Sequence, residues 1–233
     1  MPTVKNSINE YGENWKLEAL SYEINNQQAI ILVKGSYNNL ITVAYEMIVS
    51  SNGKIEIAYK LDNLPNEIIR EAGVKFHLDT VIDHLSWKRN PYWSYYPSGH
   101  LSEEEAEVQL YAESQKEYRV EPKKCWELDT KSFYYDGIKN ESIKNELTNI
   151  AKSTKENITG YHLISKGETY LSVIGNGDLG CRISKRKDDI VLYVNNQWDY
   201  VHIDWGNYHR NIKSESSYNG EIELMINTNF KQY

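Results

Sequence analysis

Short runs of alternating apolar and polar residues are the feature that most restricts the fold of this chain. Such alternation places every second side chain on one face of a strand, so each run predicts a half-buried β-strand. Asn52-Gly53, between two of the runs, predicts a tight hairpin, because this dipeptide tolerates positive φ at both central positions. The predicted strands are 17–24, 29–34, 41–49, 55–61, 74–78, 83–89, 158–165, 170–173, 180–184, 190–194 and 221–226.

These strands predict an all-β fold. Each strand has one apolar face to bury, so we expect two stacked antiparallel sheets with few short helices, one of them at 142–151. The 233 residues fall within the range of one all-β domain, and we expect a single domain over 1–233. Acidic and lysine-rich stretches predict a solvated insertion within 102–140, and a domain boundary there is the alternative.

Charge and composition restrict the partners. The formal net charge is -7, whereas nucleic-acid binders show a clustered basic stripe, so we expect no nucleic-acid partner and favour a neutral, hydroxyl-rich one. No run approaches the roughly 20 apolar residues of a membrane span, and no membrane partner is expected. The two cysteines, Cys125 and Cys181, are far apart and predict neither a zinc site nor a disulfide scaffold.

The densest aromatic cluster lies between Trp87 and His100. Flat rings with polar rims suit sugars, because a pyranose stacks its C–H face on a ring while its hydroxyls need donors and acceptors at the edge. The alternative is that these rings pack against the end of the sandwich. The candidate carbohydrate-binding residues of this segment are Trp93, Tyr95, Tyr96 and His100.

A second aromatic cluster at 197–209 adds two candidates, Trp198 and Trp205. As a strand, it would place Trp198, His202 and Asp204 on one face. The alternative is an exposed strand with a half-buried Trp. The spacing of His202, Asp204 and His209 matches no familiar ligand pattern, so we predict no metal site.

Catalytic motifs are missing from the sequence. Glu103, Glu104 and Glu105 are adjacent in a hydrophilic run, which indicates a solvated stretch and not two acids facing each other across a cleft. There is no nucleophile elbow, P-loop or dinucleotide glycine motif. We therefore predict no catalytic residue and no cofactor.

Two ordered matches give a family resemblance. Gly73–Leu78, then Asp83–Arg89, then Trp93–Pro97 follow the order of a glycine-led strand, a Trp-containing strand and an aromatic loop ending in Tyr-Pro. Leu147–Ile158 is similar to a Ser-Thr-Lys-x-Asn-Ile segment that precedes a strand. In both respects the chain resembles the C-terminal β-sandwich domain of family-two glycoside hydrolases of the β-galactosidase type, although the region 113–139 departs from that pattern.

The resemblance implies a galactose-mutarotase-like supersandwich that packs on a catalytic (β/α) barrel lying upstream in a longer polypeptide. In that family the catalytic glutamates belong to the barrel, and the sandwich closes one wall of the sugar site with a late aromatic residue, here Trp205 or Trp198. We therefore expect a non-catalytic domain of a glycoside hydrolase that contributes to binding a galactoside-like carbohydrate. A periplasmic or extracellular location stays open for the parent enzyme.

Two other functions stay open. The first is a free-standing sugar-binding protein or aldose-1-epimerase-like enzyme of the same fold, in which His100 or His202 with Asp204 would supply the acid and the base. The second is a structural interaction domain whose exposed aromatic residues form an interface.

Overall fold

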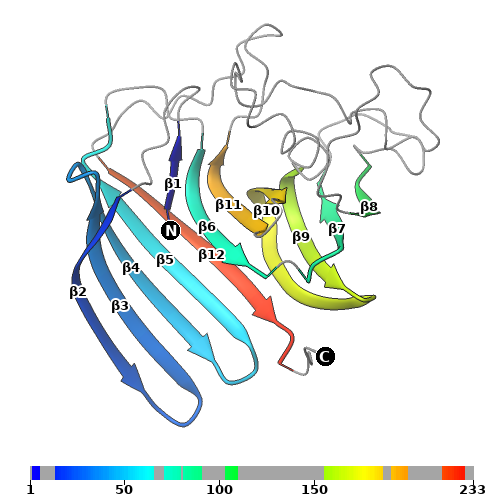
Figure 1. Cartoon of the computed structure of the whole chain (residues 1–233), viewed down its shortest axis with the longest axis horizontal. Helices are drawn as coiled ribbons and strands as arrows, with labels where there is room; N and C mark the ends of the chain where they lie inside the picture. The colour runs from blue at the N-terminus through cyan, green and yellow to red at the C-terminus, as the bar shows by residue number, and fades with distance from the viewer. Residues whose placement is uncertain are drawn as a thin grey trace, which may run out of the picture.

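The computed structural model describes residues 2–5, 14–65, 71–79, 81–90, 103–109, 155–185, 190–198 and 217–228. Every regular element in these ranges is a strand (Figure 1), which confirms the all-β prediction. The same ranges contain no helix long and apolar enough to span a membrane. The predicted helix at 142–151 and most of the predicted insertion lie outside them. The strands are β1 (Pro2–Lys5), β2 (Trp15–Ile24), β3 (Gln28–Tyr37), β4 (Ile41–Ser50), β5 (Lys54–Asp62), β6 (Glu71–Leu78), β7 (His84–Arg89), β8 (Glu105–Gln109), β9 (Lys155–Ser165), β10 (Glu168–Lys185), β11 (Ile190–Trp198) and β12 (Ser217–Ile226).

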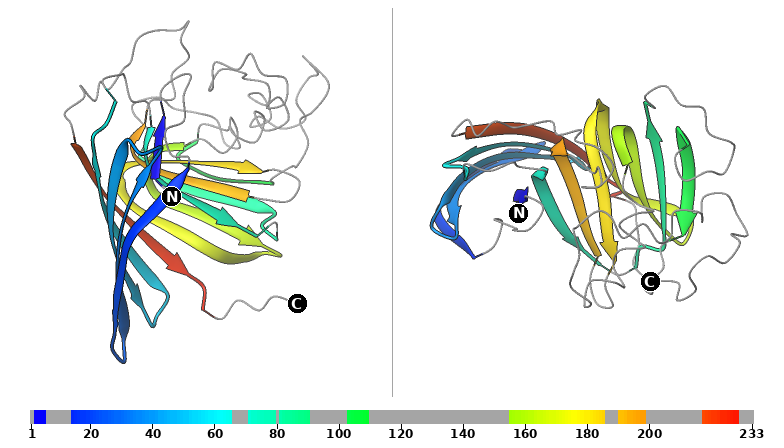
Figure 2. Two further views of the ribbon diagram at one scale, coloured as in Figure 1. Left: turned by 60° about the vertical axis from the view of Figure 1, so that its left-hand side comes forward. Right: turned by 90° about the horizontal axis from the view of Figure 1, so that it is seen from above.

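The described strands form one antiparallel network that branches at β10. The first half of β10 pairs with β12, which leads to β5, β4, β3 and β2; we call these five strands the long arm. Its second half pairs with β11, which leads to β6 and β1, the short arm. Along its other edge β10 pairs with β9, which leads to β7 and β8. The long arm curls around the short arm (Figure 2), so the two layers of the expected sandwich share β10.

Strand β10 corrects the prediction of two separate strands at 170–173 and 180–184, because one strand of 18 residues covers both. The glycines between them indicate a turn in the sequence, but they serve close packing here. A Cβ on Gly175 would lie 2.2 Å from the carbonyl oxygen of Ile158 on β9, and Gly177 has a φ of 101°. The pairing with β9 shifts register between Ile174 and Leu179, so the strand bends without ending.

The hairpin between β4 and β5 is confirmed, with a different turn from the expected one. Only Gly53 has a positive φ, of 91°. Its N–H donates to the carbonyl of Ser50 at 3.0 Å, while the side chain of Asn52 accepts from the N–H of Lys54 at 3.0 Å. The turn therefore uses the Asn side chain as an acceptor and needs only one residue in the left-handed region.

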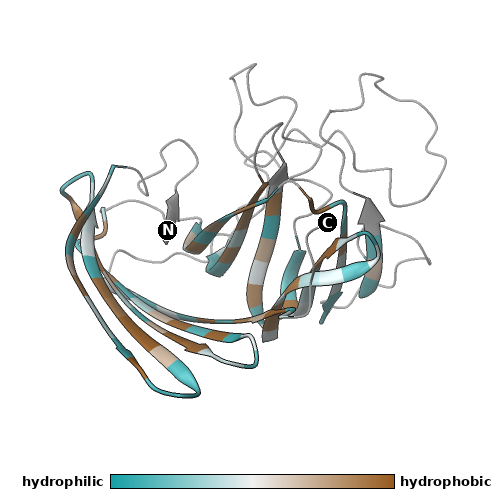
Figure 3. Cartoon of the chain, turned by 60° about the horizontal axis from the view of Figure 1, so that its bottom comes forward, coloured by the Kyte–Doolittle hydropathy of each residue, from teal (hydrophilic) through white to brown (hydrophobic). Residues whose placement is uncertain are grey.

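One buried apolar cluster lies between the arms and continues onto β7, β9 and β10, where Leu85, Trp87, Tyr161 and Leu163 belong to it. On the long arm, the inner face carries buried residues such as Val43, Ile57 and Leu61, and the outer face carries exposed ones such as Glu56 and Lys60. This alternation appears as changing colours along the strands in Figure 3. The Tyr59 hydroxyl makes a bifurcated hydrogen bond, with its shorter branch to Oδ1 of Asn196 on β11 at 2.8 Å and its longer branch to the carbonyl of Ala72 on β6 at 3.3 Å, and so links the two layers.

A buried ion pair lies next to this core and joins β10 to β6. Arg182 Nε and Nη2 donate to the two carboxylate oxygens of Glu71 at 2.8 and 2.9 Å, and both residues are buried. The guanidinium carbon lies 3.5 Å from the ring centroid of Tyr193 on β11, the strand between them. Charge, hydrogen bonding and ring stacking thus hold three neighbouring strands in register.

Candidate functional site

Most of the predicted site residues lie outside the described part of the chain: Trp93, Tyr95, Tyr96, His100 and Trp205, together with His202, Asp204 and His209. Trp198 is described, at the end of β11. Its indole is buried against Gly180, where a Cβ would lie 2.5 Å from the ring, and Nε1 donates to the carbonyl of Asp178 at 3.5 Å. Trp198 therefore packs in the core here, and carbohydrate binding by it stays a prediction.

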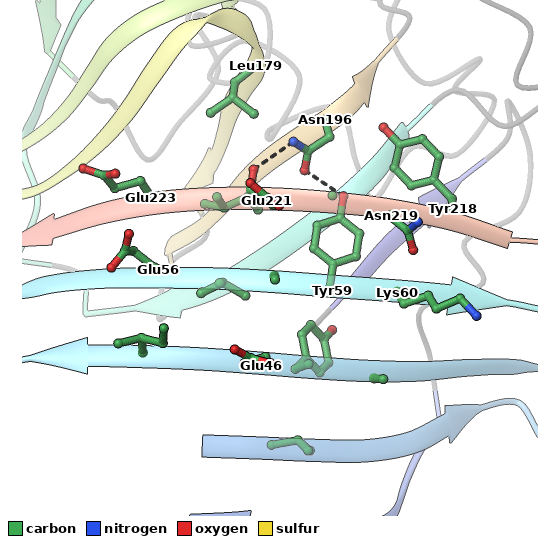
Figure 4. Close-up of a pocket in the computed structure, with 18 of the residues that line it drawn as sticks. Glu46, Glu56, Tyr59, Lys60, Leu179, Asn196, Tyr218, Asn219, Glu221 and Glu223 are labelled. Carbon is green, nitrogen blue, oxygen red and sulfur yellow. Dashed lines mark hydrogen bonds between the residues drawn. The ribbon is translucent and has the colours of Figure 1, made fainter. Parts of the chain in front are cut away.

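A trough lies on the outer face of the long arm. It has a volume of about 1200 Å³ and crosses β3, β4, β5 and β12 up to the bend of β10. Figure 4 shows its polar side chains, which come from alternate positions of neighbouring strands. Leu32, Ala58 and Ile174 contribute apolar side chains to its lining, and Glu46 lies between Leu32 and Ala58 in the same row across the sheet. The polar side chains that line it include Glu46, Glu56, Lys60, Asn219, Glu221 and Glu223.

One lysine orients two of the carboxylates. Lys54 Nζ lies 2.9 Å from Glu56 and 3.1 Å from Glu223, on neighbouring strands. These hydrogen bonds, the one to Glu56 first, raise the pKa of Lys54, so it stays a cation at neutral pH. One end of the trough therefore carries two carboxylates held in place, whose free lone pairs face solvent.

An asparagine is fixed at the edge of the trough nearest β11. The Tyr59 hydroxyl donates to Oδ1 of Asn196 at 2.8 Å, and Nδ2 of Asn196 donates to the carbonyl of Glu221 at 2.9 Å (Figure 4). Gly220 makes this contact feasible, because a Cβ there would lie 2.3 Å from the Tyr59 ring. Burial raises the pKa of Tyr59 well above its ordinary value, so the hydroxyl remains a donor.

A row of aromatic rings crosses the opposite, inner face of the same arm. Successive ring centroids lie 4.8 to 6.5 Å apart, within the range of favourable aromatic pairs. Next to the row is a smaller apolar pocket of about 330 Å³, closed on the other side by Val74 and Phe76 of β6. The row consists of Trp15, Tyr37, Tyr45, Tyr59 and Tyr218, one from each strand of the long arm.

The titratable groups that could serve catalysis are constrained. His162 Nδ1 lies 2.8 Å from Ser172 Oγ across β9 and β10, but among the described residues no carboxylate is hydrogen-bonded to Nε2, which a catalytic triad would need. Burial raises the pKa of the Cys181 thiol, so it is a poor nucleophile. Within the described ranges, no three metal-ligating side chains cluster.

Sequence reasoning missed the trough. The polar residues of each alternating run indicate that one face of the strand is exposed. They do so on any solvated sheet, whether or not that face is hollowed. The hollow depends on pairing β5 with β12, where Glu56 lies opposite Glu223, and on the bend of β10. Neither can be read from local pattern, because the partners are far apart in sequence.

Comparison with known proteins leaves the family open: no protein-family model matches the sequence, and no curated protein matches it either. The chain is thus defined at the level of its all-β, sandwich-like fold.

Proposed function

We propose that this chain is a non-catalytic carbohydrate-binding domain and that the trough on the outer face is its glycan site. The observation that carries the proposal is the trough itself: an open hollow whose lining intersperses carboxylates and amides with apolar side chains. A sugar needs this combination, because its hydroxyls form hydrogen bonds while its C–H face requires apolar contact.

The charge distribution supports a neutral ligand. Lys54 compensates one of the two negative charges of Glu56 and Glu223, so an additional cation gains less there than beside two unpaired carboxylates. An anion would meet Glu46 and Glu221 on the adjoining strands. A polyol uses carboxylates as acceptors without bringing charge, which fits the overall net charge of -7.

The resemblance to the C-terminal domain of β-galactosidase-type enzymes favours a galactoside. On that hypothesis the trough acts in a larger glycoside hydrolase whose barrel supplies the catalytic acids. The aromatic segments around Trp93 and Trp205 would then form a separate sugar contact.

Titration of the full chain with galactose, lactose and a galacto-oligosaccharide tests the proposal. Amide NMR shifts should change on β4, β5 and β12, and Glu46→Ala and Asn219→Ala should each weaken binding about tenfold through loss of a hydrogen bond. Glu168→Ala is the matched control, because this exposed carboxylate lies outside the trough. Shifts confined to other residues, or equal affinity in all variants, would contradict the assignment.

Two activity assays separate the other functions. We expect no hydrolysis of nitrophenyl galactoside and no accelerated mutarotation of α-galactose by the chain. Turnover in the first assay would identify a hydrolase in this polypeptide. Faster loss of optical rotation in the second would identify an epimerase, and either result overturns the non-catalytic assignment.

A further inference from the structure

Strand β2 exposes four large apolar side chains to solvent. It is the last strand of the long arm, and among the described strands it pairs with β3 alone. The exposed fractions are 52% for Leu17, 57% for Leu20, 67% for Tyr22 and 73% for Ile24. An apolar edge strand without proline is prone to pair with another strand.

The pairing with β3 determines which side chains of β2 share a face. Trp15 and Leu17 lie opposite Tyr37 and Gly35, and Glu18 is the extra residue of a bulge. After the bulge the alternation resumes, so Leu20 lies opposite Val33. The residues of β2 on the inner face are Trp15, Leu17, Leu20, Tyr22 and Ile24, and those on the outer face are Lys16, Ala19, Ser21 and Glu23.

This order makes β2 complementary to itself. When two copies run antiparallel with the fullest overlap of the positions paired to β3, a two-fold axis passes through Leu20. Every residue except the bulge residue Glu18 then meets one of the same face. Each apolar residue then lies opposite an apolar residue, and Lys16 lies opposite Glu23 of the other copy, twice. The opposed pairs are Trp15 with Ile24, Leu17 with Tyr22, Leu20 with Leu20, Ala19 with Ser21, and Lys16 with Glu23.

We propose that β2 is a homodimerisation edge, through which a second copy of this chain pairs antiparallel and joins the two long arms into one continuous sheet. The charge pattern fits a second copy, because in this register the two charged positions of the outer face, Lys16 and Glu23, each lie opposite a residue of opposite charge. Cross-strand apolar and ionic pairs of this kind are the stabilising units of antiparallel sheets.

Charge reversal tests the proposal, with sedimentation velocity over a micromolar concentration series of the full chain. The wild type should dimerise. Lys16→Glu and Glu23→Lys should each weaken the dimer about tenfold, since two attractive pairs become repulsive. The double variant should regain wild-type affinity. Lys16 and Glu23 are far apart within one copy, so only contact between copies explains such a rescue.

Glu168→Lys is the control, because it reverses an exposed charge outside β2 and should leave the dimer unchanged. Leu20→Lys gives a second test: it places two lysines at the two-fold axis and should yield a monomer that melts at the temperature of the wild type at dilutions where the wild type is itself monomeric. A wild type that remains monomeric over the series, or a double variant as weak as the single ones, overturns the proposal. Sugar titration of the monomeric variants reports separately on the trough.

Discussion

Replacement of Arg182 by methionine should destabilise the fold severely, because it leaves a buried carboxylate without its cation. Arg182 and Glu71 are 3% and 5% exposed, and the guanidinium donates to both carboxylate oxygens. Breaking one side of a buried ion pair costs about 3–5 kcal/mol. For a chain of this length that loss corresponds to a fall in melting temperature of roughly 10 °C.

The double variant Glu71→Leu/Arg182→Met separates the buried charge from the lost packing. Replacing both partners with apolar residues of similar volume is often neutral or stabilising. We therefore expect the double variant to unfold close to the wild type, although it loses the contact of Arg182 with Tyr193.

Urea unfolding followed by circular dichroism and by Trp fluorescence measures these differences, provided that the two probes give one transition. A cost of Arg182→Met below about 1 kcal/mol, the usual worth of an exposed pair, would show that the ion pair is not held as a buried charge. If the stability lost by the double variant equals the sum of the losses of Arg182→Met and Glu71→Leu, the unpaired charge is not the source of the penalty.

Two further predictions concern β9 and β10. Burial lowers the pKa of His162 below its ordinary 6.5, so as the pH falls the unfolded chain takes up a proton before the folded chain does. The free energy of unfolding should therefore fall as the pH drops below 6.5. His162→Gln should reduce this dependence, measured by urea unfolding between roughly pH 7 and 5. Gly180→Ala should cost about 1–3 kcal/mol, because its Cβ would lie 2.5 Å from the Trp198 ring, measured as a loss of melting temperature.

Each of these two predictions has a defined contrary result. Equal pH slopes for the wild type and His162→Gln would mean that His162 is not the group that links protonation to folding. For Gly180, the Trp198→Leu background is the control: the penalty of the added methyl should shrink there, and an unchanged penalty would place the clash elsewhere.

The N-terminal strands were predictable because their signal is local. Alternation in 41–49 and 55–61 gave β4 and β5 to within one residue, and Asn52-Gly53 gave their hairpin. β8 was missed, since Glu105 and Glu107 suggest a solvated stretch, whereas the residue between them, Ala106, packs against the core.

Features that depend on distant contacts were not predictable. The glycines of 175–180 favour a turn by every local rule, and only the approach of β9 and of Trp198 explains why they continue a strand. The same holds for the trough, where Asn196 is fixed by Tyr59, a residue 137 positions earlier. The aromatic segments that dominated the functional prediction lie outside the described ranges.

The branch at β10 also bears on how the chain folds during synthesis. β2 to β5 can pair as soon as they leave the ribosome, because each hairpin is local. The open edge of β5, however, waits for β12, and β6 waits for β11. The emerging polypeptide therefore carries an apolar, incompletely paired meander until β12 has been added, an interval in which we expect chaperones to bind it.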